Sequence, residues 1–264
     1  MRIFILLTVI IIFLSCGQDN GPGSRKDIFS GRYYDLIKAI SNNDTVQIEY
    51  LIDKYKLNVN QKDDDSIGTT LLRWSIYNNK KLSFKKLLDL GANPNFLDSI
   101  VTFPVISIAA ENPDTDYLQY CLDHKGDPNI ISYHDKNGSQ FFSPLDAAAA
   151  SGNFADEKKL VDNIKLLIKY GARVNYSQNY YMPLTDALIM RYYQKALVLL
   201  ENGADPYKVK FVRIDNPDTV GICQILTESD KYPNDEEINR SKGFVIKYLK
   251  EHYNLECSSF RISK

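Results

Sequence analysis

The stretch MPLTDALIMRYYQKALVLLENGADPY, residues 182–207, contains the two phrases that decide the fold. Its opening places Pro183 before residues of helical spacing, and proline suits the first helical position because its missing N–H would be unpaired there in any case. The apolar run at 197–200 suits the buried face of a second helix. Gly203 follows that run, where a helix C-cap needs a positive φ. The stretch therefore predicts two helices joined by a short turn.

The closing phrase, Gly-Ala-Asp-Pro-Tyr, recurs along the chain at nearly constant steps. Its relatives, the faintest of them first, lie at 57–60, 91–95, 126–129, 171–175 and 203–207. The steps between their last residues are 35, 34, 46 and 32 residues. Three of these four steps lie near 33 residues, which indicates a stack of repeats that bury their apolar faces against one another.

The opening phrase keeps a fixed distance to the closing one. Its relatives lie at 70–72, 103–105, 143–145 and 182–184. From Leu71 to Gly91 is 20 residues, and from Pro183 to Gly203 is also 20. Each phrase recurs at nearly regular intervals, and the distance from the opening phrase to the closing phrase also repeats. Such agreement argues against coincidence, so we expect one helix-turn-helix unit in each interval.

The two phrases resemble the ankyrin repeat, whose units open with Thr-Pro-Leu-His. The resemblance covers roughly residues 32–207 and implies an all-α solenoid of about five helix-turn-helix units with finger loops, within an ankyrin-repeat domain at 32–264. The predicted repeats and the divergent helical cap that follows them lie at about 32–62, 65–97, 100–131, 140–177, 180–208 and 209–264. In the cap, a final helix is expected around 244–249, and 215–241 is expected to be an irregular polar insert.

The family histidine is absent from all four clear opening phrases. Aligning the phrases places Arg73, Ile106, Asp146 and Thr185 at its position. The resemblance implies that this substitution removes a hydrogen bond between neighbouring repeats, so we expect a less rigid stack than an idealised one.

The N-terminus has the pattern of an exported lipoprotein. Arg2 precedes an apolar run at 3–14, which is too short to span a bilayer as a helix, since that needs roughly 20 residues. A buried core helix is the alternative interpretation. The run ends before Cys16 in a sequence that resembles a bacterial lipobox, which implies a signal peptide at 1–15, a lipidated Cys16 and a flexible tether at 16–31. The resemblance also implies a periplasmic location with the lipid in the outer membrane, because in lipoproteins of the enteric type an aspartate at the position of Gly17 would favour the inner membrane.

The other cysteines leave more than one interpretation open. Cys121 lies in an apolar helical stretch, which is typical of a buried thiol. Cys223 and Cys257 could pair in an oxidising compartment, but the sequence does not establish their distance.

Composition and motifs argue against several classes of function. The formal net charge is −1 and Lys and Arg are scattered, whereas nucleic-acid binding needs a concentrated basic surface. The three histidines are dispersed, and no nucleophile motif, phosphate loop or zinc spacing is present. We therefore expect a protein that is not an enzyme and uses no cofactor and no metal.

Two irregularities of spacing point to a binding surface. The loop from Asn129 to Pro144 is about six residues longer than its counterparts, and Asn137-Gly138 favours a tight turn that would project it. In the fourth unit, about seven extra residues fall near 153–159, between its two helices.

Ankyrin-like proteins bind partners with their fingers and with the concave face of their first helices. The resemblance therefore implies partner contacts at Tyr77, Tyr133, His134, Asp135, Phe141, Phe142, Tyr180, Tyr181, Met190, Arg191 and Tyr192. Tyrosine and phenylalanine bury much area at little entropic cost, which suits a protein partner. Packing of Phe141 and Phe142 on the fourth repeat is the alternative for those two, and Trp74 has a competing role between repeats.

These features together predict a lipid-anchored module that binds a protein in the bacterial envelope. Ankyrin-like lipoproteins of this size look like immunity proteins that block secreted antibacterial toxins, especially phospholipase effectors. The expected partner is then a secreted toxin or lipase. The alternative is an envelope scaffold or stress-tolerance adaptor that recruits a resident protein with the same surface.

Overall fold

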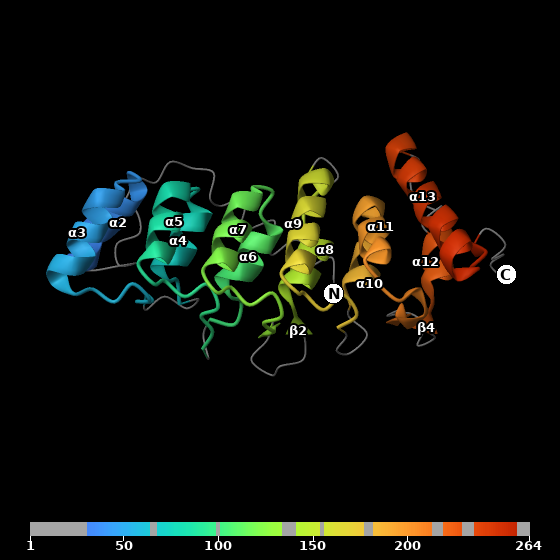
Figure 1. The fold of residues 1–264 in the computed structure, drawn as a ribbon, viewed down its shortest axis with the longest axis horizontal. Helices are drawn as coiled ribbons and strands as arrows, with labels where there is room; N and C mark the ends of the chain where they lie inside the picture. Colours follow the sequence, from blue (N-terminus) through green and yellow to red (C-terminus); the bar gives the residue numbers. More distant parts are fainter. Residues whose placement is uncertain are drawn as a thin grey trace.

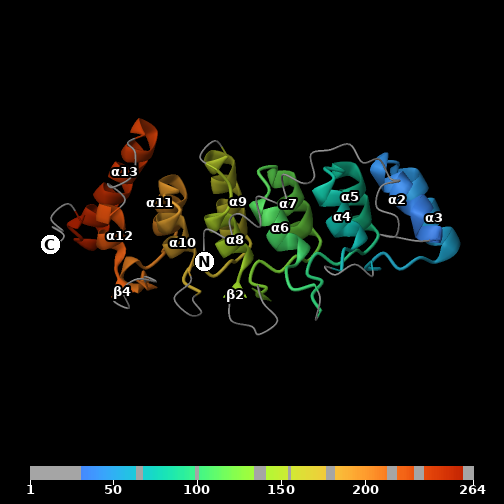
Figure 2. The same cartoon turned by 180° about the vertical axis from the view of Figure 1, so that it is seen from behind.

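Six helix pairs stand in a row in the computed structural model of the chain, which describes residues 31–63, 68–98, 101–133, 141–153, 156–176, 182–212, 219–228 and 235–257 (Figures 1 and 2). The pairs are α2 (Arg32–Ser41) with α3 (Thr45–Tyr55), α4 (Leu71–Tyr77) with α5 (Lys81–Asp89), α6 (Val105–Glu111) with α7 (Thr115–Asp123), α8 (Pro144–Ala150) with α9 (Glu157–Lys169), α10 (Pro183–Ile189) with α11 (Tyr193–Glu201), and α12 (Ile222–Glu228) with α13 (Glu236–Tyr253). Each of the five predicted repeat ranges thus contains one pair.

The helices form two layers. The even-numbered helices from α2 to α12 are the first helices of the pairs, and each packs against the next to make a first-helix row. The odd-numbered helices from α3 to α13 are the second helices, and they form a second-helix row behind it in the same way. Each repeat therefore buries apolar surface against the repeats on either side, as expected of a linear stack.

Two short antiparallel hairpins lie at one edge of the stack, where the first helices begin (Figure 1). β1 (Ser132–Tyr133) pairs with β2 (Phe141–Phe142) before α8, and β3 (Phe211–Val212) pairs with β4 (Thr219–Val220) before α12. The first hairpin is the finger that the long loop at 129–144 predicts.

The segment expected to be a cap is a sixth helix pair. Helix α12 packs on α10 in the first-helix row, and α13 packs on α11 in the second-helix row. The prediction of an irregular insert at 215–241 is wrong for α12 and for the start of α13. The short α12 was missed because Ile222, Ile225 and Leu226 give it a single apolar face within a polar stretch. A disulfide joins Cys223 of α12 to Cys257, which follows α13.

Side-chain caps fix where helices α4 and α8 begin. Thr70 accepts a hydrogen bond from the N–H of Arg73, and Ser143 forms a capping box with Asp146. Pro104, however, precedes α6 as its N-cap and is not its first residue. The alignment at 103–105 was therefore wrong by one residue, and Ser107, not Ile106, stands in the position of the family histidine.

Asp146 is buried and is expected to make stability depend on pH. Burial raises the pKa of Asp146 to about 6, and its Oδ1 has no hydrogen-bond partner among the described residues. Between about pH 4 and pH 6 the folded chain holds a proton that the unfolded chain has lost, so stability falls as pH rises. Asp146→Asn removes this cost. Urea unfolding should show its advantage over the wild type growing by about 2 kcal/mol from pH 4 to pH 7.

The matched control for this prediction is Asp162→Asn, at an exposed position of the second-helix row. It should follow the wild type at every pH. An Asp146→Asn variant whose stability stays parallel to that of the wild type from pH 4 to pH 7 would contradict the prediction.

An asparagine ladder explains the closing phrase. The side-chain oxygen of Asn95 accepts a hydrogen bond from the N–H of Asp127 at 2.8 Å, and its side-chain nitrogen donates one to the carbonyl of Lys125 at 2.8 Å. Both partners lie in the next repeat. The same pair of bonds to the next repeat is made by Asn60, Asn129 and Asn175. Each of the four steps between the first five repeats is thus fastened by backbone groups that would otherwise lack partners. The ladder supplies ties between repeats that the missing histidines do not.

The glycine of the phrase has the expected conformation in three repeats. Gly91, Gly171 and Gly203 have φ values of 92°, 89° and 88° after their helices. In the third repeat Lys125 takes the positive φ, at 64°, and Gly126 does not. A Cβ on Gly126 would lie 2.6 Å from the carbonyl oxygen of Cys121, so glycine is required there by a close approach.

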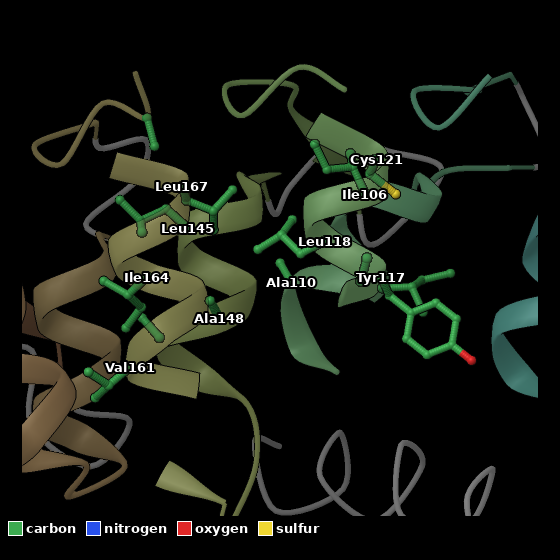
Figure 3. Close-up of a cluster of buried hydrophobic side chains, with 14 of the residues drawn as sticks. Ile106, Ala110, Tyr117, Leu118, Cys121, Leu145, Ala148, Val161, Ile164 and Leu167 are labelled. Atoms are coloured by element: carbon green, nitrogen blue, oxygen red, sulfur yellow. The ribbon is translucent and has the colours of Figure 1, made fainter. Parts of the chain in front are cut away.

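The core is continuous along the stack, and Figure 3 shows the part between the third and fourth repeats. Side chains from both helices of one repeat meet those of the next. The labelled members are Ile106, Ala110, Tyr117, Leu118, Cys121, Leu145, Ala148, Val161, Ile164 and Leu167. Small residues such as Ala110 and Ala148 allow the first helices to approach closely, as the alanines of the sequence suggest.

A second line of ties, which we call the polar seam, runs inside the second-helix row. Ser83 donates to the carbonyl of Ile40 at 2.9 Å. At the equivalent position two repeats on, Asn163 donates to the carbonyls of Ala110 at 3.0 Å and Asn112 at 2.7 Å. Each side chain reaches the end of the first helix of the preceding repeat, where carbonyls lack partners within the helix.

The two other positions of the polar seam carry larger side chains. Tyr117 packs its ring edge-to-face on Phe84 of the preceding repeat, with centroids 4.9 Å apart. Lys195, which is fully buried, donates to the carbonyls of Ala148 at 2.8 Å and Ser151 at 2.6 Å. Buried polar groups therefore fasten the repeats at their helix ends as well as at their loops.

Candidate protein-binding surface

Several predicted site residues lie outside the described residues. They are Cys16, His134, Asp135, Tyr180 and Tyr181. The backbone of Tyr133 and Phe141 is described, and the two residues pair directly across the finger hairpin. The predictions for these residues remain predictions.

The base of the finger is fixed to the fourth repeat. Ser132 pairs with Phe142 in the hairpin, and its buried hydroxyl donates to the Phe142 carbonyl at 2.7 Å. Strand β2 contacts α8, and Phe142 is half-buried there. Its partial exposure is compatible both with packing on the fourth repeat and with partner contact.

Tyr77 is the predicted contact residue that the structure places most clearly at the surface. It ends α4 in the first-helix row, and 42% of its surface is exposed. Trp74, three positions earlier on the same helix, is half-buried and packs against the core. The competing packing role that the sequence suggests for Trp74 is thus present, together with some exposed surface.

Arg73 lies one turn before Tyr77 and was not among the predicted contact residues. Its guanidinium carbon stands 5.9 Å from the centre of the Tyr77 ring. Arg73 is only 8% exposed, and among the described residues it makes no ion pair and no side-chain hydrogen bond. The sequence signal for it is that a large cation stands where Ser107, Asp146 and Thr185 are small or acidic.

The three predicted contacts at 190–192 separate in the structure. Met190 and Arg191 are half-buried in the turn between α10 and α11, at the end of α10 away from the hairpins. The prediction that Tyr192 faces a partner is wrong, because Tyr192 is 5% exposed and its hydroxyl donates to the Gly152 carbonyl. It is a packing residue between the fourth and fifth repeats.

Tyr192 belongs to a buried charged cluster. The ammonium of Lys195 lies over its ring, 4.3 Å from the centroid. Buried Glu157 accepts the N–H of Gln194 at 2.9 Å. Burial lowers the pKa of Lys195 to about 8, against the attraction of Glu157, so the lysine keeps its charge at neutral pH. The cluster ties the fourth and fifth repeats together.

A groove of about 480 Å³ lies between α9, α11 and α13. It exists because α11 has nine residues, whereas α9 has thirteen and α13 has eighteen, so the two long helices extend past the short one (Figure 1). Part of the insertion predicted near 153–159 thus lengthens α9. The groove is lined by charges of both signs, Lys158, Asp162, Lys165, Glu237 and Arg240, with Phe244 half exposed.

The described histidines have structural contacts. His124 bonds the carbonyl of Tyr120 at 2.8 Å and Asp89 of the preceding repeat at 3.0 Å. His252 stacks on Tyr248 in α13. In the described part of the chain, no group of three His, Cys, Asp or Glu side chains could hold a metal ion. No helix among the same residues has the length and hydrophobicity needed to cross a bilayer.

Comparison with known proteins identifies the fold. No family model and no curated protein matches the chain. Among solved structures, an ankyrin repeat domain of Acinetobacter baumannii AYE is 23% identical with a TM-score of 0.59, over 81% of this chain and 98% of the other. The ankyrin repeat protein EF0377 is 23% identical with a TM-score of 0.56, over 82% and 96%. The human ASB11 ankyrin repeat domain is 16% identical with a TM-score of 0.55, over 80% and 82%.

These likenesses, together with the two helix rows, confirm the predicted fold class. The chain is an all-α ankyrin-repeat solenoid, to which two short hairpins and a sixth helix pair are added.

Proposed function

We propose that this ankyrin-repeat solenoid is a non-enzymatic, lipid-anchored module of the bacterial envelope that binds a protein. Its partner is a secreted antibacterial toxin of the phospholipase type, which it blocks as an immunity protein. The lipid on Cys16 and the tether at 16–31 hold the module where an incoming enzyme would attack lipid.

The observation that carries the proposal is the distribution of exposed aromatic side chains. Between 37% and 62% of each of these side chains is exposed, and they occur from the first helix pair to the last: Tyr34, Tyr50, Tyr77, Tyr170, Tyr207 and Phe244. Aromatic residues of this kind dominate protein interfaces. An extended stack offers them to a large partner, whereas a small ligand would need a closed pocket.

The disulfide supports an exported location. Disulfides persist in oxidising compartments such as the bacterial periplasm and are rare in the cytosol. The Cys223–Cys257 bond joins the last helix pair, which agrees with the signal and lipobox interpretation of residues 1–16.

The test uses a soluble form, Cys16→Ser with residues 1–15 removed, as bait for periplasmic and secreted proteins of its own organism. The expected result is one stoichiometric hydrolase, identified by mass spectrometry, whose cleavage of phospholipid vesicles stops when the bait is added. Changing Tyr133 and Phe142 to alanine should weaken the complex by 10-fold or more, as at an interface hot spot. Leu82→Ala, at an exposed apolar position of the second-helix row that is not among these aromatic residues, is the matched control and should leave the affinity unchanged.

Each other outcome contradicts the proposal in a defined way. Recovery of a resident envelope protein favours a scaffold or stress-tolerance adaptor. Recovery of a hydrolase that remains active in the complex excludes the immunity role and keeps the binding role.

A further inference from the structure

Arg73 is a buried cation for which the described residues supply no counter-charge. The structure leaves 8% of its surface exposed, and no described carboxylate lies within ion-pair distance of it. Its Nε is fully buried and has no hydrogen-bond partner among the described residues. Burying a charge in this way is costly unless the charge is paired, so the arrangement reduces the stability of the free protein.

The contact between Arg73 and the Tyr77 ring does not offset the cost of burying the charge. The guanidinium stands 5.9 Å from the Tyr77 ring centre, at the outer limit of a cation–π contact. The same separation occurs between Arg240 and Phe244 of α13, where the arginine is exposed and remains hydrated. The two pairs have the same distance from guanidinium carbon to ring centre, but only Arg73 is buried.

The surroundings of Arg73 form a patch suited to a protein partner. We define the Arg73 patch as Arg73, Trp74 and Tyr77, one turn of α4 in the first-helix row. Arginine, tryptophan and tyrosine are the residue types in which interface binding energy concentrates. Tyr77 offers an exposed ring beside the guanidinium, and Trp74 is half-buried next to it.

We propose that the Arg73 patch binds an acidic side chain, Asp or Glu, of the partner protein, held against an apolar neighbour of that residue. A carboxylate supplies the negative counter-charge that the described residues do not give Arg73. Its two oxygens also match the planar donor fork of a guanidinium. The Tyr77 ring covers the adjacent apolar part of the partner segment. The inference rests on the proposed function only in that the partner is a protein.

The first arm of the test measures the stability of the free protein. Arg73→Met keeps most of the side-chain length and removes the unpaired charge, so the Tm of the full-length chain in detergent should rise by about 3 °C. Arg240→Met, the matched control, should leave the Tm unchanged. A fall in Tm for Arg73→Met would assign the arginine a structural role and overturn the proposal.

The second arm measures binding with a random heptapeptide library selected on the full-length wild-type chain. Selected peptides should share one Asp or Glu next to an aromatic or aliphatic residue. Their affinity should fall by about 10- to 100-fold on Arg73→Met and stay unchanged on Arg240→Met. Replacing the shared acidic residue by its amide should give the same loss on the wild type and no further loss on Arg73→Met.

Three results would overturn the proposal. They are an empty selection, peptides without a shared acidic position, and peptides that bind Arg73→Met as well as the wild type.

This arm also separates the proposal from the proposed function. A captured toxin whose affinity is unaffected by Arg73→Met leaves the immunity role intact and excludes the patch. Acidic peptides that require Arg73, with no toxin recovered, leave the patch intact and exclude that role.

Discussion

Replacing Lys195 by methionine is expected to lower the free energy of unfolding by about 3 kcal/mol, since buried hydrogen bonds to a charged group contribute about 1.5–3 kcal/mol each. Lys195 is fully buried and donates to the carbonyls of Ala148 and Ser151 at the end of α8. Methionine fills similar space but removes the donor of both carbonyls, and the Ala148 carbonyl keeps only a long bond of 3.5 Å from the Ser151 hydroxyl. Relief of the desolvation of the ammonium offsets part of this loss, so the net change is smaller than the sum of the two bonds.

The loss should appear first at the boundary between the fourth and fifth repeats. Stability in such stacks depends on interfaces between neighbours, so α10 to α13 should exchange amide hydrogens faster than α2 to α7. Urea unfolding gives the total change, and hydrogen exchange gives its location. The matched control is Lys169→Met, at an exposed position of α9, which should stay within about 0.5 kcal/mol of the wild type. Equal stability of the two variants would show that Lys195 is not a tie between repeats.

Removing the disulfide is expected to destabilise the sixth helix pair by about 4 kcal/mol, the chain-entropy value for a closed loop of this size. The bond closes a separation of 34 residues between Cys223 and Cys257. Helices α12 and α13 each pack mainly on the helix of their own row in the fifth repeat, so the disulfide is a direct link between them. The double variant Cys223→Ser, Cys257→Ser should therefore lose the sixth pair at a lower temperature than the rest of the stack.

Thermal unfolding with and without dithiothreitol measures this effect. Reduction of the wild type should reproduce the unfolding curve of the double variant, and dithiothreitol should not change the double variant itself. Cys121 is buried and burial raises its pKa, so it does not complicate the comparison. A single transition at the temperature of the oxidised wild type, in both the double variant and the reduced wild type, would contradict the expectation.

The repeated phrases predicted the fold because each phrase has a local physical role. Pro183 at a first helical position and Gly203 at a positive φ mark where helices begin and end, and they do so without help from the rest of the chain. Asn95 and its equivalents also repeat at the period, although the hydrogen bonds that they make appear only when repeats stack.

The parts that the sequence did not predict depend on tertiary contacts. Lys195 stands in an amphipathic pattern like a surface lysine, and only the end of α8 beside it makes a buried ammonium useful. Arg73 has no local signal beyond its size. Tyr192 was misjudged because a tyrosine after a turn suits an interface or a core equally well. Helix α12 has seven residues like α4, α6, α8 and α10, but it was missed because it does not carry the opening phrase that marks the start of those helices.

The candidate site was predicted only in part, because some of its features also depend on tertiary contacts. Tyr77 follows from its place at the end of a first helix, whereas the burial of its neighbour Arg73 is a property of the stack. The pairing of Cys223 with Cys257 stayed open because their distance depends on how α12 and α13 dock.

Because of the asparagine ladder, the number of residues in a repeat does not determine how it is bonded to the next repeat in the stack. Asn129 makes the usual two bonds to the following repeat, although the step there is 46 residues and not about 33. Residues added in a finger loop and between the two helices of a unit therefore leave intact the bonds that set the spacing of its neighbours. Such a scaffold can acquire new surface by insertion in one module at a time, so recognition can diversify in evolution while the architecture is inherited unchanged.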